Sequence, residues 1–326
     1  MRSRRPIFKS LALLILVILL LAGWTHARAI QDWWKLRDYT APANVVSVAS
    51  EDTLTPEATH IFYVNHPQLI ANVATFRQGC SESEQTIVLG CYHPDQNGID
   101  IYDVQDSRLH GVQEVTAAHE MLHAAYDRLS SGERSRVDGL LQDYYNNNLH
   151  DQRIISTINA YKKTEPNDVV NEMHSVFGTE VADLPAALES YYSQYFSDRA
   201  TVVDYAQSYE GEFTSRLAQI DADDVQLADL KTQIDSEEQS LNNQLNQINS
   251  DRSRLDQLRS SGQAEQYNAQ VPAFNAEVDG YNRGVTALQS DIANYNSLVS
   301  ARNSIATELR GLDQSLDTRL TPQTAQ

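Results

Sequence analysis

The spacing of apolar residues predicts short strands and a helix in the first part of the chain. Apolar runs with strand composition occupy His60–Val64, Thr86–Leu89 and Ile99–Val104, and Pro67–Arg77 has the composition of a helix. The last of these runs follows the turn signal Asn97-Gly98 and alternates apolar and polar side chains for most of its length. It therefore reads as a half-buried strand.

A helical period follows immediately. Val115, Ala118, Leu122, Ala125 and Leu129 recur at helical spacing and form one apolar stripe. Between Val115 and Tyr126, Glu120 is the only charged residue that interrupts the stretch. The pattern predicts a mostly buried helix.

The next segment is almost entirely helical by pattern. Ser130 and Glu133 have the spacing of a capping box and begin a helix that runs toward Tyr144. Further helices are expected over Asp151–Lys163 and over Asn167–Phe177, the latter opened by Pro166 and stopped by Gly178.

The carboxy-terminal third has a seven-residue period. In the first arm the period is carried by Ile220, Leu227, Ile234, Leu241, Ile248 and Leu255. Their partners four residues on, at 224, 231, 238 and 252, are charged, so this seam is thin. In the second arm Tyr267, Phe274, Tyr281, Leu288 and Tyr295 are each followed four residues later by Val or Ile. Both arms have the pattern of a coiled coil.

The two arms, 217–258 and 271–316, have similar lengths and are separated by Ser260-Ser261-Gly262, which favours an antiparallel hairpin. Pro272 either starts the second arm or kinks it. A parallel homodimer is the alternative. The fold class expected overall is α+β and mostly α: a small domain with a short mixed sheet, followed by the helical hairpin.

Charge and the amino terminus indicate an exported protein. The net charge is −19, which argues against nucleic acid or anionic lipid as the principal partner. The first 29 residues carry basic side chains and no acid, and Leu11–Ala22 is apolar throughout. This segment is either a signal anchor, with Trp24, Trp33 and Trp34 at the outer interface, or a signal peptide cleaved after Ala29. We favour a single-pass anchor that leaves the bulk of the chain outside the cytoplasm.

The two cysteines agree with export. Cys80 and Cys91 are the only cysteines, and their spacing matches no common zinc-binding motif. In an exported chain they are expected to form a small disulfide loop.

The candidate chemistry lies on the buried helix, in the sequence His119-Glu120-Met121-Leu122-His123. His119 and His123 are one helical turn apart, so their imidazoles can bind one ion, and neutral imidazole nitrogens suit zinc. Glu120 can take a proton from a water molecule that the zinc acidifies. These residues predict a hydrolase for amide bonds.

The segment resembles the active-site helix of the zincin metallopeptidases, in which this motif is embedded in an uncharged helix. The resemblance implies a third zinc ligand. The metzincin pattern is excluded, because Tyr126 and Leu129 stand where a glycine and a third histidine are required. Asn171-Glu172-Met173-His174-Ser175 instead resembles the segment that supplies a glutamate in gluzincins, which makes Glu172 the expected ligand and His174 its competitor, with Glu180 a further possibility.

Other roles follow from the same resemblance. His174 or a nearby tyrosine, Tyr191 among them, would stabilise the oxyanion of the transition state. The Ile99–Val104 strand would hold the substrate backbone at its edge, as the edge strand of zincins does.

The sequence thus predicts an exported zinc metallopeptidase that acts on a protein or peptide substrate. The expected domains are the signal segment (1–29), a juxtamembrane linker (30–58), a zincin-like domain (59–198), the hairpin (199–320) and a tail (321–326). One alternative is a non-catalytic envelope adaptor that binds an envelope protein, or a second copy of itself, through the coiled coil. Another is a zinc amidase that acts on cell-wall material.

Overall fold

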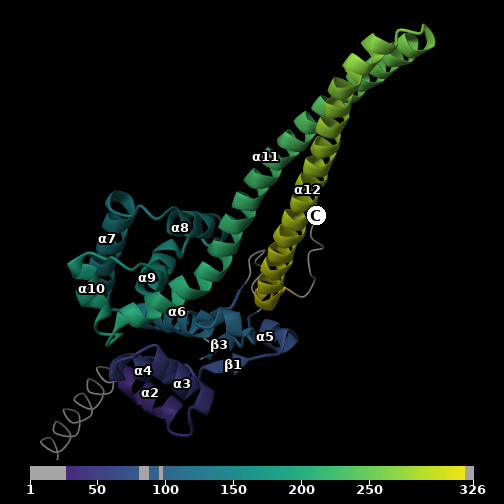
Figure 1. The fold of residues 1–326 in the computed structure, drawn as a ribbon. Coiled ribbons are helices and arrows are strands. Elements are labelled where there is room, and N and C mark those ends of the chain that lie inside the picture. Colours follow the sequence, from purple (N-terminus) through teal and green to yellow (C-terminus); the bar gives the residue numbers. More distant parts are fainter. Residues whose placement is uncertain (1–26, 81–87, 95–97, 320–326) are drawn as a thin grey trace, which may run out of the picture. The chain divides into compact units, whose positions relative to one another are not determined.

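The computed structural model describes residues 27–80, 88–94 and 98–319. The chain divides into a core unit, Met1–Glu210 with Ser315–Gln326, and a hairpin unit, Gly211–Gln314 (Figure 1). Helices dominate both units, and one three-stranded mixed sheet lies in the core unit. The α+β, mostly helical class is therefore confirmed.

The sheet is built from a different set of strands from the one expected. Its strands are β1 (Gln68–Ile70), β2 (Gly90–His93) and β3 (Gly98–Tyr102), arranged β1-β3-β2, with β1 parallel and β2 antiparallel to β3. The prediction that the Ile99–Val104 segment is an edge strand is wrong, because residues 68–70, expected in a helix, pair with it. The strand β3 is therefore central, and β1 and β2 are the two edges of the sheet.

Four helices surround these strands: α2 (Ala27–Leu36), α3 (Ala43–Glu51), α4 (Pro56–Val64) and α5 (Val73–Gly79). The predicted strand His60–Val64 is wrong. Thr55 Oγ1 accepts a hydrogen bond from the Ala58 amide (3.2 Å) and Pro56 occupies the first turn, so this apolar run begins as a capped helix. The predicted linker 30–58 is also wrong, because α3 buries Val45 and Val48 in the main hydrophobic core.

The centre of the core unit is α6 (Val112–Asp127), followed by α7 (Ser131–Asn147), α8 (Gln152–Thr164), α9 (Val169–Glu180) and α10 (Ala186–Tyr192). The capping box of Ser130 and Glu133 is confirmed. Gly178 does not stop α9 but lies within it. A Cβ at that position would come within 2.4 Å of Leu122 Cδ1, so the glycine permits the close packing of α9 on α6.

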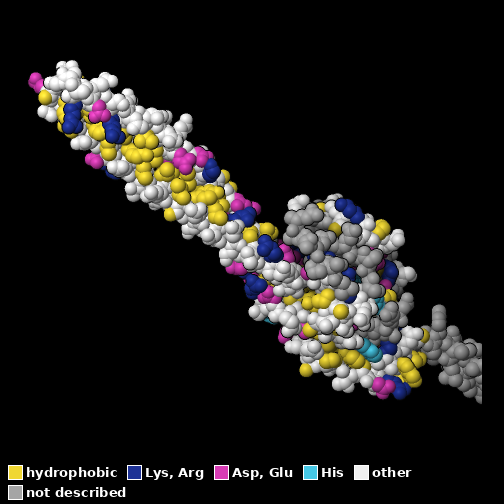
Figure 2. All heavy atoms as spheres, turned by 90° about the vertical axis from the view of Figure 1, so that its right-hand side faces the viewer, with side chains coloured by type: hydrophobic (Ala, Val, Ile, Leu, Met, Phe, Trp, Pro, Cys, Tyr) yellow, Lys and Arg dark blue, Asp and Glu magenta, His cyan; other side chains and the backbone are white. Residues whose placement is uncertain are grey.

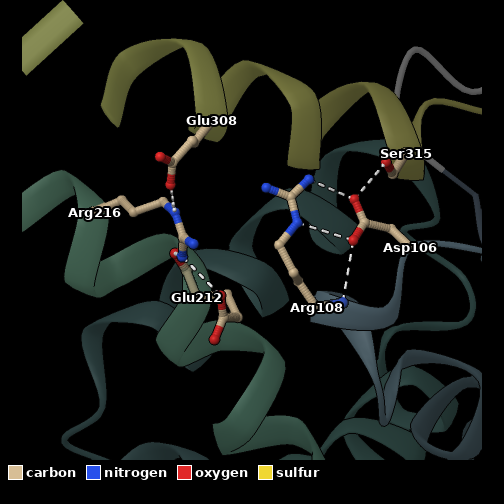
Figure 3. Close-up of polar contacts among 6 residues, drawn as sticks. All are labelled: Asp106, Arg108, Glu212, Arg216, Glu308 and Ser315. Carbon is tan, nitrogen blue, oxygen red and sulfur yellow. Dashed lines mark hydrogen bonds and ion pairs between the residues drawn. The ribbon is translucent and has the colours of Figure 1, made fainter. Parts of the chain in front are cut away.

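The long helices α11 (Arg199–Ser260) and α12 (Ala264–Leu316) are joined by a turn in which Gly262 has a φ of 77°. Within the hairpin unit, Arg216 Nε lies 3.3 Å from Glu308 Oε2 (Figure 3), and Arg302 Nε donates to Asp224 Oδ1 at 2.9 Å. These pairs join early residues of one arm to late residues of the other, which confirms the antiparallel hairpin. Pro272 lies inside α12.

The first arm faces its partner with a different set of residues from the one expected. After Ile220 and Ile248 the second seam position lies three, not four, residues on, so Asp223 (3% exposed) and Asp251 (7%) are buried there. Leu230 and Leu258 occupy two equivalent positions and are half-buried. Hydrophobic side chains gather along the hairpin on the face seen in Figure 2.

The chain returns to the core unit after the hairpin. Ser315 Oγ donates to Asp106 Oδ2 (3.1 Å), whose carboxylate also binds Arg108 (Figure 3), and Thr318 Oγ1 donates to the Val88 carbonyl (2.7 Å). The expected disulfide is present between Cys80 and Cys91. Within the described ranges, no helix has the length and hydropathy to cross a membrane; residues 1–26, most of the expected signal segment, and the 321–326 tail lie outside them.

Candidate metal centre

Two packed helices bring three predicted ligands together. The buried helix α6 carries His119 and His123, and α9, which packs directly on it, carries Glu172. The apolar stripe of α6 predicts this placement, because both histidines lie at its edge, where the core meets a cleft. Glu172 occupies the same kind of position on α9 and is only 5% exposed.

The three donor groups have the spacing that one ion requires. His119 Nε2 lies 3.6 Å from Glu172 Oε2, and His123 Nε2 lies 3.4 Å from Glu172 Oε1. One ligand atom from each residue falls within 4.8 Å of the others. Tetrahedral donors about 2.0–2.1 Å from zinc lie roughly 3.3–3.4 Å apart, so the residues present fit this metal.

The electrostatics of the Glu172 carboxylate agree with a cation site. Burial alone would raise the pKa of Glu172, but the neighbouring His123, His119 and Tyr161 outweigh it and lower the pKa. The carboxylate is therefore ionised although it is buried. Its Oε2 atom has no hydrogen-bond partner, and such an atom is costly to bury unless a positive charge compensates it.

A cleft of about 630 Å³ opens beside these groups. His119, Glu120, His123 and Glu172 line it, and so does Gly90 of the edge strand β2. A Cβ on Gly90 would lie 2.8 Å from Glu120 Oε1, so the glycine lets the strand backbone approach that side chain closely. Glu120 is thus adjacent to the ligands and faces the same cleft, as a general base must.

The cleft lining is strongly acidic. Six carboxylates line it, and the described part of the lining contains no lysine or arginine. They are Glu120, Asp127, Glu165, Asp168, Glu172 and Glu180. Glu180 is paired with Arg153 Nη1 at 2.5 Å. The cleft therefore has a negative potential beyond that of the candidate ligands.

Tyr161 of α8 is a site residue that the sequence analysis missed. It lines the cleft together with Glu172, and its proximity helps to lower the pKa of that carboxyl. Burial and the nearby Glu172, Glu180 and Glu120 raise the pKa of Tyr161, so the phenol stays protonated and can donate. Ile154 and Ile158 precede it at helical spacing on the buried face of α8, a signal that predicts its inward orientation but not its neighbours.

His174 and Tyr191 lie elsewhere. His174 is fully buried, and its Nε2 atom is 2.8 Å from the Tyr191 hydroxyl, which in turn lies 3.3 Å from the Tyr195 hydroxyl. Neither His174 nor Tyr191 lines the cleft, so the expected oxyanion role of these residues has no geometric support. Because His174 follows Glu172 by two residues in the helix, its side chain points away from Glu172 and into the hydrophobic core.

Two further groups of side chains have metal-ligand spacing. Cys80, Cys91 and His93 form one, but both thiols are consumed by the disulfide. The other, Glu165, Asp168 and Glu172, shares Glu172 with the histidine site. Within the described ranges, the group of His119, His123 and Glu172 is therefore the only one of the three that offers nitrogen ligands and contains no disulfide-bonded cysteine.

Comparisons of the chain with models of protein families, with curated proteins and with solved structures find no match. The candidate centre therefore rests on its own residues and their geometry.

Proposed function

We propose that this chain is a zinc-dependent hydrolase of peptide bonds. The observation that carries the proposal is the convergence of His119, His123 and Glu172 on one point beside Glu120, at the edge of a cleft. The resemblance of the His119–His123 segment to zincins supports the same reaction. A bound zinc would acidify water and polarise the scissile carbonyl.

In the proposed reaction Glu120 accepts the proton of the attacking water and passes it to the leaving amine. Tyr161, protonated and beside Glu172, is placed to donate to the oxygen of the carbonyl as charge develops on it, a role for which it replaces His174 and Tyr191. The free edge of β2 borders the cleft and offers backbone groups to an extended substrate.

The test is a glutamate-to-glutamine exchange at position 120. Glu120→Gln keeps the shape of the side chain but removes the base, so hydrolysis should fall by roughly 10²–10⁴-fold while zinc content stays unchanged. Hydrolysis is measured with a quenched-fluorescence peptide library, and zinc by mass spectrometry of the purified protein. Glu172→Ala should lose the zinc as well.

Glu114→Gln is the matched control. Glu114 is also a buried glutamate of α6, so the exchange makes the same chemical change in the same helix. The residue does not line the cleft, and its variant should keep both zinc and activity. Full activity of Glu120→Gln would rule the mechanism out.

The zinc amidase acting on cell-wall material would use the same centre. Release of fragments from purified cell walls, in the absence of cleavage of any library peptide, would select it. Stoichiometric zinc with no turnover in either assay would select the adaptor, whose partner would bind through the coiled coil.

A further inference from the structure

One face of α2 is apolar and exposed. Ile30, Trp33 and Trp34 are 54%, 63% and 64% exposed. Their spacing of three and four residues places them on one side of the helix, followed by Arg37 one turn later. The Arg37 guanidinium lies 4.5 Å from the centre of a Trp34 ring, and its Nε donates to Asp38 Oδ2 at 2.8 Å, so an exposed ion pair lies at the rim of the apolar face.

The opposite face fixes α2 to the core unit. Asp32 is 6% exposed; its carboxylate lies 3.1 Å from His60 Nε2 and also accepts a hydrogen bond from Arg128. The Lys35 carbonyl lies 3.0 Å from His66 Nε2. These contacts hold the helix in one orientation, so the folded unit keeps Trp33 and Trp34 exposed.

We propose that this face of α2 binds the surface of a lipid bilayer, with Ile30, Trp33 and Trp34 in the headgroup region. Indole rings are amphipathic and rigid, and they favour the headgroup region of a bilayer. An arginine beside them can reach the lipid phosphates. A short helix with an apolar aromatic face and a charged rim is the usual form of an interfacial anchor. The inference does not depend on the proposed hydrolase.

The chain outside the described residues supports lipid as the occupant. The 26 residues before α2 include the uninterrupted apolar run Leu11–Ala22, so the chain enters α2 from a stretch with its own affinity for lipid. A protein partner is disfavoured by size. The three side chains expose roughly 400 Å² in all, whereas a stable protein interface buries about 800 Å² on each partner.

The protein contains three tryptophans, so its own fluorescence tests the proposal. Full-length Trp24→Phe protein is reconstituted into phosphatidylcholine–phosphatidylglycerol vesicles, which leaves Trp33 and Trp34 as the only emitters. Matched vesicles carry bromine on the acyl chains, either near the headgroups or near the bilayer centre. If Trp24→Phe does not fold, the difference between wild type and Trp33→Phe/Trp34→Phe gives the same spectrum.

We expect blue-shifted emission that is protected from acrylamide and quenched more strongly by bromine near the headgroups than by bromine at the centre. Emission typical of water-exposed indole, unaffected by brominated lipid, would overturn the proposal. A blue shift without quenching by bromine would also overturn it, since it would mean that a second protein copy covers the helix. Quenching that is strongest at the bilayer centre would equally contradict a surface location.

Discussion

Replacement of Gly90 by alanine tests the geometry of the site in a single step. Gly90 lies in the edge strand β2, and an added Cβ would come within 2.5 Å of Thr116 Cγ2 and 2.8 Å of Glu120 Oε1. Thr116 is fixed on the buried helix α6, whereas the end of the Glu120 side chain can move. Strand and helix must therefore separate, and Glu120 must leave its position.

The size of the effect follows from the overlap. Ordinary contacts begin near 3.4 Å, so the added methyl overlaps Thr116 by about 0.9 Å. A misplacement of about 1 Å in a catalytic group costs on the order of 10²-fold in rate. Overpacking costs about 1–3 kcal/mol of stability. In a unit of this size that corresponds to a fall in Tm of roughly 2–12 °C.

Three measurements on Gly90→Ala separate these effects: kcat/KM for a library peptide, bound zinc and Tm. We expect lower activity and Tm with zinc retained, because the atoms nearest to the added methyl belong to Thr116 and Glu120 and not to the zinc ligands. Gly98→Ala is the control, since Gly98 is also a strand glycine and nothing lies within 4 Å of its added Cβ. Unchanged activity and Tm in Gly90→Ala would refute the packing described, and loss of zinc would refute the selective displacement of Glu120.

Three further predictions concern stability and substrate. Burial, together with the nearby Glu114 and Glu51, raises the pKa of the Asp52 carboxyl. The folded protein therefore loses stability as the pH rises through that pKa, because the carboxyl must then ionise while buried. The Tm of Asp52→Asn should accordingly exceed that of the wild type by an amount that grows with pH. Removing the cystine by Cys80→Ser/Cys91→Ser should cost ~3 kcal/mol in denaturant unfolding. Peptides with lysine near the scissile bond should be cleaved faster than matched norleucine peptides, and Glu165→Gln/Asp168→Asn should reduce that ratio.

Each of these has a result that would count against it. A constant difference in Tm across the pH range would show that Asp52 titrates normally. Equal denaturation midpoints of wild type with and without reductant would deny the cystine its stabilising role. Asp183→Asn removes one exposed charge outside the cleft, and an equal loss of lysine preference in that variant would assign the effect to net charge rather than to the cleft.

The sequence predicts the elements whose signals are local. The stripe on α6, the capping box at Ser130 and the two helical arms of the hairpin depend on helical spacing alone, and each forms as expected, although the first arm uses a different second seam position. Their faces also predict which side chains enter the cleft. The spacing of His119 and His123 requires no knowledge of the tertiary fold.

The errors arise where distant residues decide the outcome. His60–Val64 has strand composition, but Thr55 and Pro56 start a helix there. The Ile99–Val104 pattern predicts a strand but does not identify the strands that pair with it. The short strand β1, which pairs with it, lies in a segment of helical composition. Hydrophobic spacing reports which face is buried and leaves the identity of the neighbour open.

The roles assigned to His174 and Tyr191 failed for a related reason. Both residues are close in sequence to Glu172 and chemically suitable, yet α9 directs His174 into the core. Tyr161 reaches the cleft from α8, a helix that carries none of the other candidate residues. Proximity along the chain was a poor guide to proximity in space.

The return of the chain to the core unit sets an order of events in folding. Asp106 and Val88 meet residues 209 and 230 positions later, at Ser315 and Thr318. Closing so long a loop is slow for a random coil. If the two helical arms pair locally, starting at the turn around Gly262, they bring the two ends of the loop together first. The final contacts of the core unit must therefore wait until residues 315–318 have been synthesised, and arms that cannot pair should delay its maturation even where they leave the cleft residues untouched.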